Sequence, residues 1–176
     1  MLIEMGYQFE VMAADIDEKA IRHDNPKELV LALANAKADA LLPRISAPAI
    51  LITADQVVAW KDEIREKPEN EEEARRFLRT YHEAPADIIN ATVVTNTATG
   101  KRAFGIDSSL VYFKQIPKKV IDALIAKGRI FSKAGGFEIV DPLFEPYLEK
   151  VEGTVDQVTG LPKEFTQRLI KEVQNG

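Results

Sequence analysis

The chain of 176 residues is long enough for one folded domain, and its 45% hydrophobic and 29% charged residues are typical of a packed protein rather than a disordered one. Its formal net charge of −5 argues against general affinity for nucleic acid or an anionic membrane surface, although a local site for a small anion is compatible with it. The sequence contains no cysteine, which excludes disulfides, a thiol nucleophile and a thiolate metal site.

The first predicted elements are a strand and a helix. Residues 7–13, "YQFEVMA", form an extended run that predicts the first strand. A helix is predicted to begin at Pro26, because Asn25 is a suitable cap and proline fits the first helical position. The apolar face of this helix is predicted to contain Leu29, Leu33, Ala36 and Ala40.

The next segment predicts a pair of strands followed by a second helix. Residues 49–53, "AILIT", are a continuous β-prone run, and residues 57–60, "VVAW", follow closely. A turn at residues 61–63 then leads the chain back through Ile64. The run "NEEEARRFLRTY" predicts a helix that is capped by Asn70.

The second half of the chain predicts further strands and two helices. The run "IINATVVTNTATGKRAFG" predicts two strands around a turn at Gly100, and "LVYF" continues the sheet. The run "PKKVIDALIAKG" predicts a helix that ends at Gly128, "FEIV" and "YLEKV" predict short strands, and "PKEFTQRLIKEV" predicts the last helix. Because βα units are mixed with at least one hairpin, we expect an α/β fold with a mixed sheet.

Asp55 is the first candidate site residue. It interrupts the apolar stretch "ITADQVVAW" where the strand at residues 49–53 is expected to end. Ligands of α/β proteins bind beyond the carboxyl ends of strands, where a carboxylate can bind Mg²⁺ or deprotonate a water molecule. The alternative is a turn between two strands, and position alone does not decide between the two.

Two charged groups precede this strand. Asp15, Asp17 and Glu18 form an acidic cluster that suits a divalent cation, although such clusters are more often solvated loops. Lys37 falls about 80° from Leu29 on a helical wheel, and therefore close to the apolar face. Its ammonium group either extends to solvent along the helix edge or contacts an anion.

Two lysines later in the chain are candidate substrate ligands. Lys67 in "REKPEN" is held extended by the following Pro68. Lys133 precedes the pair Gly135 and Gly136 in "SKAGGFEIV", and glycines allow a backbone to approach a phosphate. The simpler interpretation is a surface lysine and a bend, because neither GxxxxGK[ST] nor GxGxxG occurs in the sequence.

Six motifs occur in a fixed order over nearly the whole chain. They are "DIDE", "LALANAKADA", "TADQVV", "REKP" with "EEARRFL", "KAGGFEI" and "VEGTVDQVTGLP". This ordered set resembles the Maf family of nucleotide pyrophosphatases, whose fold is distantly shared with the inosine triphosphate pyrophosphatases. The resemblance implies a single Maf-like domain over residues 1–176, with a mixed, twisted central sheet flanked by helices and two lobes around a cleft.

The resemblance also implies an activity. Members of the family hydrolyse a nucleoside triphosphate, in some cases a modified one, to the monophosphate and pyrophosphate with a divalent metal cation, Mg²⁺ or Mn²⁺. Relatives are often dimers, so a homodimer is one expected state. The sequence has neither a signal-peptide pattern nor an apolar stretch long enough to span a membrane, and we expect a cytoplasmic protein without nucleic-acid or membrane partners.

The family pattern implies roles for five residues of this chain. It makes Asp55 the catalytic residue and a metal-side carboxylate, with Glu18 as a second metal-side carboxylate. It makes Lys37 and Lys67 ligands of the phosphates. Gln56 lies where the family selects the base, and its amide suits a base edge because it both donates and accepts hydrogen bonds.

Three departures from the family pattern affect these expectations. The Asp55–Gln56 pair resembles the 7-methyl-GTP branch, but Val140 stands where a Gln or Glu is usual and "YHEAP" replaces an "SG" turn, so the base preference is left open. Family members also begin with a strand and a loop resembling S-x-S-x-x-R, whereas this sequence opens at "MLIEMGYQF" and is truncated relative to them. The arginine of that loop would clamp a phosphate in a bidentate manner that lysine does not reproduce. We therefore expect reduced turnover, and the alternative function is a catalytically impaired Maf-like protein that binds nucleotide or a partner.

Overall fold

Two compact units make up the computed structural model, which describes residues 1–175. Unit 1 consists of Met1–Asp55, Asn90–Asp107 and Thr159–Gly176, and unit 2 consists of Gln56–Ile89 and Ser108–Val158. The boundary between the units falls between Asp55 and Gln56, the adjacent pair that the sequence singles out. Each unit has its own buried core.

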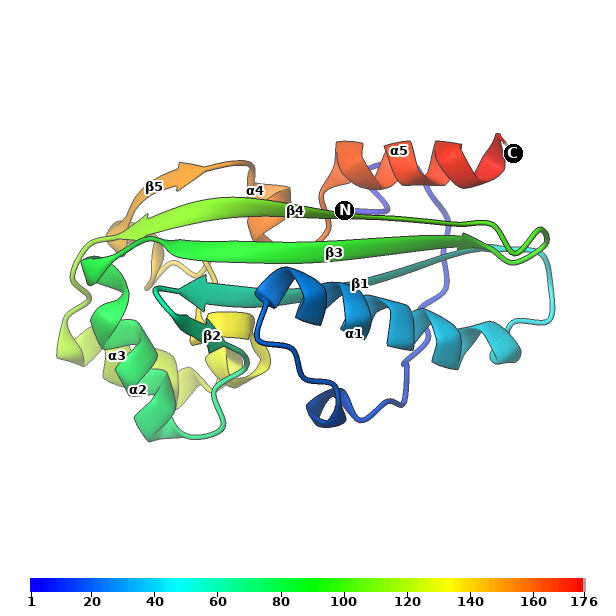
Figure 1. Cartoon of the computed structure of the whole chain (residues 1–176). Coiled ribbons are helices and arrows are strands. Elements are labelled where there is room, and N and C mark those ends of the chain that lie inside the picture. The colour runs from blue at the N-terminus through cyan, green and yellow to red at the C-terminus, as the bar shows by residue number, and fades with distance from the viewer. Residues whose placement is uncertain (176) are drawn as a thin grey trace. The chain divides into compact units, whose positions relative to one another are not determined.

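The strands form one five-stranded sheet in the order β2-β1-β3-β4-β5. Their bounds are Ile50–Trp60 for β1, Glu63–Arg65 for β2, Ala86–Asn96 for β3, Arg102–Phe113 for β4 and Leu148–Glu152 for β5. Neighbouring strands run antiparallel, as the arrows in Figure 1 indicate. The predicted α/β class with helices around a sheet is confirmed, but the predicted mixed pairing is wrong. Short hairpins join β1 to β2 and β3 to β4, whereas longer segments that contain α2 and α3 lie between β2 and β3 and between β4 and β5.

The predicted helices are confirmed, and their caps explain where they begin and end. Their bounds are Pro26–Leu41 for α1, Glu71–Thr80 for α2, Lys118–Lys127 for α3 and Lys163–Gln174 for α5, with a short additional helix α4 at Val155–Val158. The side-chain oxygens of Asn25 and Asn70 each accept a backbone N–H bond of 2.9 Å at the start of α1 and α2. None of the helices within residues 1–175 is both long and apolar enough to cross a membrane.

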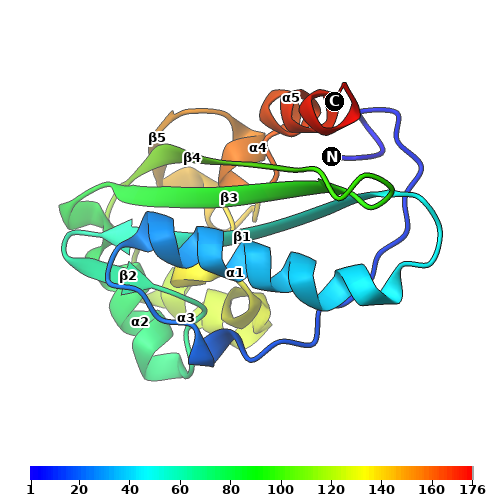
Figure 2. The same ribbon diagram turned by 45° about the vertical axis from the view of Figure 1, so that its right-hand side comes forward.

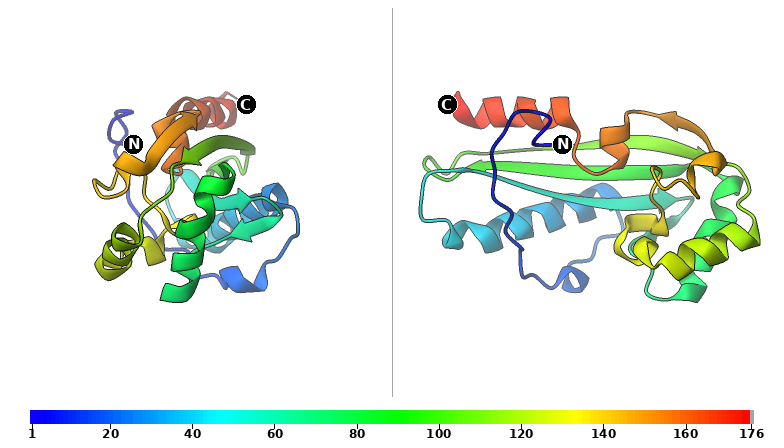
Figure 3. Two further views of the ribbon diagram at one scale, coloured as in Figure 1. Left: turned by 90° about the vertical axis from the view of Figure 1, so that its left-hand side faces the viewer. Right: turned by 180° about the vertical axis from the view of Figure 1, so that it is seen from behind.

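Two of the predicted strands are wrong. Residues 7–13 have no regular secondary structure, and the right-hand view of Figure 3 shows this segment passing from the N-terminus towards the short helix at Glu18–Ala20 without joining the sheet. Residues 137–140 form a loop that ends in a turn. An alternating pattern becomes a strand only where a neighbouring strand supplies hydrogen-bond partners, and local sequence does not report that neighbour.

In unit 1, α1 and α5 cover opposite faces of the sheet (Figures 1 and 2). Ile50 and Ile52 of β1 pack against a buried cluster that includes Leu169 of α5. The hydroxyl of Thr53 instead donates to the backbone carbonyl of Ala34 in α1 at 2.8 Å. Because successive side chains of a strand point to opposite faces, Asp55 lies on the same face as Thr53, towards α1.

In unit 2, helices α2 and α3 pack beside each other (left-hand view of Figure 3). Both contribute to a buried core that contains several aromatic rings. The ring centroids of Phe113 and Phe137 lie 5.1 Å apart at an angle of 68°, and Tyr81 meets Phe137 at 5.2 Å and 87°. Edge-to-face contacts of this kind place the positive rim of one ring against the negative face of the other. The core therefore holds the Tyr81 ring in a defined orientation.

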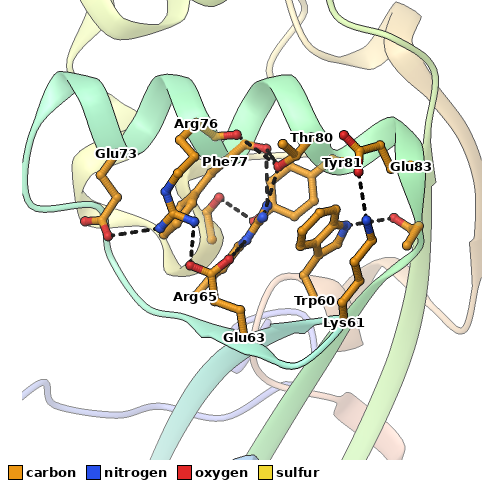
Figure 4. A network of polar contacts seen from close by, with 12 residues as sticks. Trp60, Lys61, Glu63, Arg65, Glu73, Arg76, Phe77, Thr80, Tyr81 and Glu83 are labelled. Atoms are coloured by element: carbon orange, nitrogen blue, oxygen red, sulfur yellow. Dashed lines mark hydrogen bonds and ion pairs between the residues drawn. The ribbon is translucent and has the colours of Figure 1, made fainter.

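Arg65, at the end of β2, is a buried cation in this core, with an exposed fraction of 1% (Figure 4). Its guanidinium carbon lies 3.8 Å from the centroid of the Trp60 ring and 4.7 Å from that of Tyr81. Its nitrogens donate to the carboxylate of Glu63 at 2.9 Å and to the backbone carbonyl of Phe77 at 3.2 Å. Stacked rings and directed acceptors together offset the loss of hydration that burial of a charge entails.

Candidate active site

Lys37 joins two carboxylates in unit 1. Its Nζ atom lies 2.5 Å from Oδ1 of Asp55 and 2.8 Å from Oε1 of Glu18. The three side chains come from α1, β1 and the short helix at Glu18–Ala20, which are separate segments of the chain. The structure thus brings together Glu18, Lys37 and Asp55, and their formal charges leave a net charge of −1.

Local structure explains how each member of this cluster is placed. Asp17 caps the short helix by accepting a bond of 3.1 Å from the backbone N–H of Lys19, so that Glu18 is the member of the acidic run that contacts Lys37. Asp55 lies within the 11-residue strand β1, so the expectation that the strand ends there is wrong. Its position towards α1 follows from strand alternation, and Lys37 reaches it from the facing helix.

The two carboxylates determine the charge of Lys37. Burial alone would lower the pKa of its ammonium group, but the charges and hydrogen bonds of Asp55 and Glu18 outweigh burial and raise the pKa above the ordinary 10.5. Lys37 is therefore a permanent cation at neutral pH. Because two carboxylates already contact its ammonium group, a phosphate that binds Lys37 would share the ammonium group with these carboxylates.

This pKa direction predicts how stability depends on pH. The Lys37 ion pairs stabilise the fold fully below the ordinary pKa of 10.5, and that contribution is lost as the pH rises through the raised pKa. The thermal unfolding midpoints of the unsubstituted chain and of Lys37→Met are therefore expected to differ at about pH 8 and to converge as the pH rises through the raised pKa of Lys37. Lys27→Met, on the same helix, controls for the loss of one positive charge. A constant difference between the Lys37→Met variant and the unsubstituted chain would contradict the expectation.

The other predicted site residues lie in unit 2. Gln56 donates from Nε2 to the backbone carbonyl of Val158, at the end of α4, over 3.0 Å. Because a carbonyl only accepts hydrogen bonds, the nitrogen end of the amide must face α4. Lys67 is exposed in the loop of residues 66–69, which we call the Lys67 loop.

Lys133 lies in a turn of residues 132–136, which we call the Lys133 turn. Its Nζ atom is 3.3 Å from Oε1 of Glu138, an atom that also accepts from Arg129 at 3.1 Å. Glu138 is a contact that the sequence analysis missed. It stands in the same motif as Lys133, but no periodic pattern distinguishes it from other surface acids. Val140, two residues further along the chain, is exposed.

Gly135 connects the Lys133 turn to the Lys67 loop. Its backbone N–H donates to the carbonyl of Glu66 at 2.9 Å, and Gly136 lies against Pro68, with 3.2 Å between a built Cβ and the proline ring. Gly135 has a φ of +68°, and a Cβ atom there would lie 2.7 Å from the hydroxyl of Tyr81. The position therefore requires glycine both for its backbone conformation and for lack of space.

Replacement of Gly135 by alanine should cost more than replacement of Gly128, the residue that ends α3. Both residues have positive φ, but a Cβ at Gly128 meets nothing within 4 Å. We expect Gly128→Ala to lower the free energy of unfolding by about 1 kcal/mol and Gly135→Ala by about 2 kcal/mol more, owing to steric overlap. Denaturant titrations followed by circular dichroism measure both values. Equal decreases in the free energy of unfolding would show that the neighbours of Gly135 move aside at no energetic cost.

Two carboxylates, rather than a complete ligand set, are available for a metal ion in unit 1. Within residues 1–175, no group of three or more His, Cys, Asp or Glu side chains is close enough to hold a metal by itself. Mg²⁺ is commonly bound through one or two carboxylates together with substrate phosphates and water molecules. Glu18 and Asp55, which meet at one ammonium group, fit a cation of that kind.

Comparison with known proteins agrees with the arrangement of these motifs. A family model described as "Maf-like protein" matches residues 1–173. A 7-methyl-GTP pyrophosphatase of Dictyostelium discoideum is 42% identical, over 98% of this chain and 90% of that protein. A dTTP/UTP pyrophosphatase of Alkaliphilus metalliredigens is 33% identical, over 92% of this chain and 83% of that protein. A nucleoside triphosphate pyrophosphatase of Thermosynechococcus vestitus is 29% identical, over 97% and 85% respectively. With this match over nearly its whole length, the chain belongs to the Maf family.

Proposed function

We propose that this chain hydrolyses a nucleoside triphosphate to the nucleoside monophosphate and pyrophosphate in the presence of a divalent cation. The observation that carries the proposal is the cluster of Lys37 with Glu18 and Asp55, in which an ammonium group is bonded at 2.5 and 2.8 Å to two carboxylates. A net negative charge suits a cation that arrives with the triphosphate. Membership in a family with relatives named as pyrophosphatases supports the same reaction.

The chemistry assigns a role to each residue of the cluster. A water oxygen forms a bond to the α-phosphorus, the bond from that phosphorus to the bridging oxygen breaks, and pyrophosphate leaves. Asp55 accepts the proton of the attacking water as general base. Lys37 orients the Asp55 carboxylate by donating a hydrogen bond to its Oδ1 atom. Glu18 and Asp55 would hold a divalent cation, which supplies positive charge where negative charge develops on the phosphoryl oxygens.

Roles in substrate binding are also proposed for three residues of unit 2. Lys67 and Lys133 offer ammonium groups to the phosphates, and Gln56 is proposed to contact the base. Among bases, 7-methylguanine is the first candidate, because the relative with 42% identity is named a 7-methyl-GTP pyrophosphatase and the Asp55–Gln56 pair resembles that branch. Thymine and uracil are the second candidates, from the relative with 33% identity.

A panel of nucleoside triphosphates tests the reaction and the base preference together. The panel contains the canonical nucleotides and 7-methyl-GTP, each with Mg²⁺, with Mn²⁺ and with a chelator, and the products are separated by chromatography. The proposal requires equal amounts of monophosphate and pyrophosphate that depend on the cation. Nucleotide binding without pyrophosphate release would instead support the catalytically impaired alternative. Release of inorganic phosphate as the first product would exclude the proposed bond cleavage.

The expected homodimer and cytoplasmic location stay predictions. Light scattering coupled to gel filtration measures the first, and a tagged chain followed in cells measures the second. Neither outcome changes the roles proposed for the cluster of unit 1, because all three of its residues come from the same chain.

A further inference from the structure

The hydroxyl of Tyr81 is a buried polar group in the aromatic core of unit 2, where the guanidinium of Arg65 also faces the Tyr81 ring. The residue is 1% exposed, and its ring contacts Trp60, Phe113 and Phe137. A hydroxyl buried among rings needs a hydrogen-bond partner, because it has lost its water. It donates to the backbone carbonyl of Gly135 over 2.8 Å.

The direction of this bond is fixed by the chemistry of both partners. Burial raises the pKa of the Tyr81 hydroxyl well above its ordinary value, so the group keeps its proton at any working pH. The carbonyl of Gly135 can only accept. The hydroxyl therefore acts as a fixed donor that holds the backbone of the Lys133 turn.

Gly135 is held from both sides. Its carbonyl accepts from Tyr81, while its N–H donates to the carbonyl of Glu66 in the Lys67 loop at 2.9 Å. The next residue, Gly136, donates its N–H to the carbonyl of Lys133 at 3.0 Å, which closes the turn. Gly135 alone thus links the core tyrosine, the Lys133 turn and the Lys67 loop.

The two lysines that the proposed function assigns to the phosphates stand next to these contacts. Lys67 follows Glu66 directly, and Lys133 lies two residues before Gly135. Two flexible ammonium groups bind a polyanion more tightly when the backbones that carry them are already ordered, because less conformational entropy is lost on binding. We propose that Tyr81 is a positioning residue for the triphosphate, which holds the Lys133 turn against the Lys67 loop through Gly135.

The expected effect on KM rests on the proposed function, whereas the effect on the order of the Lys133 turn is measured independently of it. Tyr81→Phe removes the hydroxyl and keeps the ring. A control is Trp60→Phe, which removes another side-chain donor of this core, the 3.1 Å bond from Nε1 to the carbonyl of Ala84, a carbonyl outside the Lys133 turn.

The two variants are compared in hydrogen exchange and in steady-state kinetics with the best nucleotide of the panel. Tyr81→Phe is expected to speed amide exchange in residues 133–136 and to raise KM roughly three- to tenfold, the equivalent of one hydrogen bond. Its kcat should change by no more than about twofold, because the lysines are expected to bind substrate and transition state alike. Trp60→Phe should leave KM and the exchange of the turn at the values of the unsubstituted chain.

The outcomes separate the two proposals. If the unsubstituted chain hydrolyses triphosphates but Tyr81→Phe leaves KM unchanged, or if both variants raise KM equally, the positioning role is wrong and the proposed function stands. If the unsubstituted chain releases no pyrophosphate, both proposals are overturned. Faster amide exchange of the Lys133 turn in Tyr81→Phe together with an unchanged KM would also overturn the inference, because the order of the turn would then have no effect on substrate binding.

Discussion

Asp55→Asn is expected to reduce the rate of pyrophosphate release by about 10²- to 10⁴-fold, the usual contribution of a general base. Asparagine has nearly the same shape as aspartate and still accepts a hydrogen bond from Lys37, but it does not take a proton from water. The fold should persist, because Lys37 keeps its ion pair of 2.8 Å with Glu18. Initial rates from a coupled pyrophosphate assay measure the loss, and circular dichroism verifies the fold.

Asp39→Asn is the matched control. Asp39 is also a carboxylate of unit 1 in an ion pair, with Arg102 at 2.6 Å, but it has no contact with the cluster of Lys37 and Asp55 among the bonds of the described chain. Its replacement should leave the rate unchanged. Retention of the full rate by Asp55→Asn, or an equal loss in both variants, would exclude the role given to Asp55.

Arg65→Met should lower the free energy of unfolding by about 3–5 kcal/mol, the largest stability effect expected in this chain. Methionine fills much of the space, but the carbonyl of Phe77 and the hydroxyl of Thr80 would each lose a hydrogen bond from the guanidinium, of 3.2 and 2.9 Å respectively. The stacking of the guanidinium on the Trp60 ring at 3.8 Å would also be lost. Trp60 is the only tryptophan, so its fluorescence in a urea titration reports unfolding at this place.

Lys61→Met distinguishes a buried cation from an exposed one at the same ring. Lys61 also contacts the ring of Trp60, with 4.3 Å from Nζ to the centroid, but its side chain is 46% exposed. Exposed ion pairs and cation–π contacts contribute little because water competes for the charge. Its replacement should leave the free energy of unfolding nearly unchanged. Similar decreases in the free energy of unfolding for Arg65→Met and Lys61→Met would mean that burial of Arg65 does not increase its contribution to stability.

Helix positions in this chain are predictable because their causes are local. Asn25, Asn70 and Gly128 each act within one turn of their own helix, as caps that satisfy or terminate the backbone pattern. Strands were predicted less well. Residues 7–13 and 137–140 have strand-like composition but no neighbouring strand, whereas β1 continues through Asp55, where a polar side chain suggested its end.

The sequence by itself determined the four longer helices, the α/β class and, through the order of its motifs, the family. It also singled out Glu18, Lys37 and Asp55, which the structure brings together and whose roles stay predictions. Only the tertiary structure decided that Arg65 is buried and that Tyr81 holds Gly135, which is 54 positions further along the chain. A helix cap depends on a few adjacent residues, so it can be predicted from the sequence. The partner of a buried polar group depends on which distant segments the fold brings within hydrogen-bond distance, and no local pattern encodes that distance.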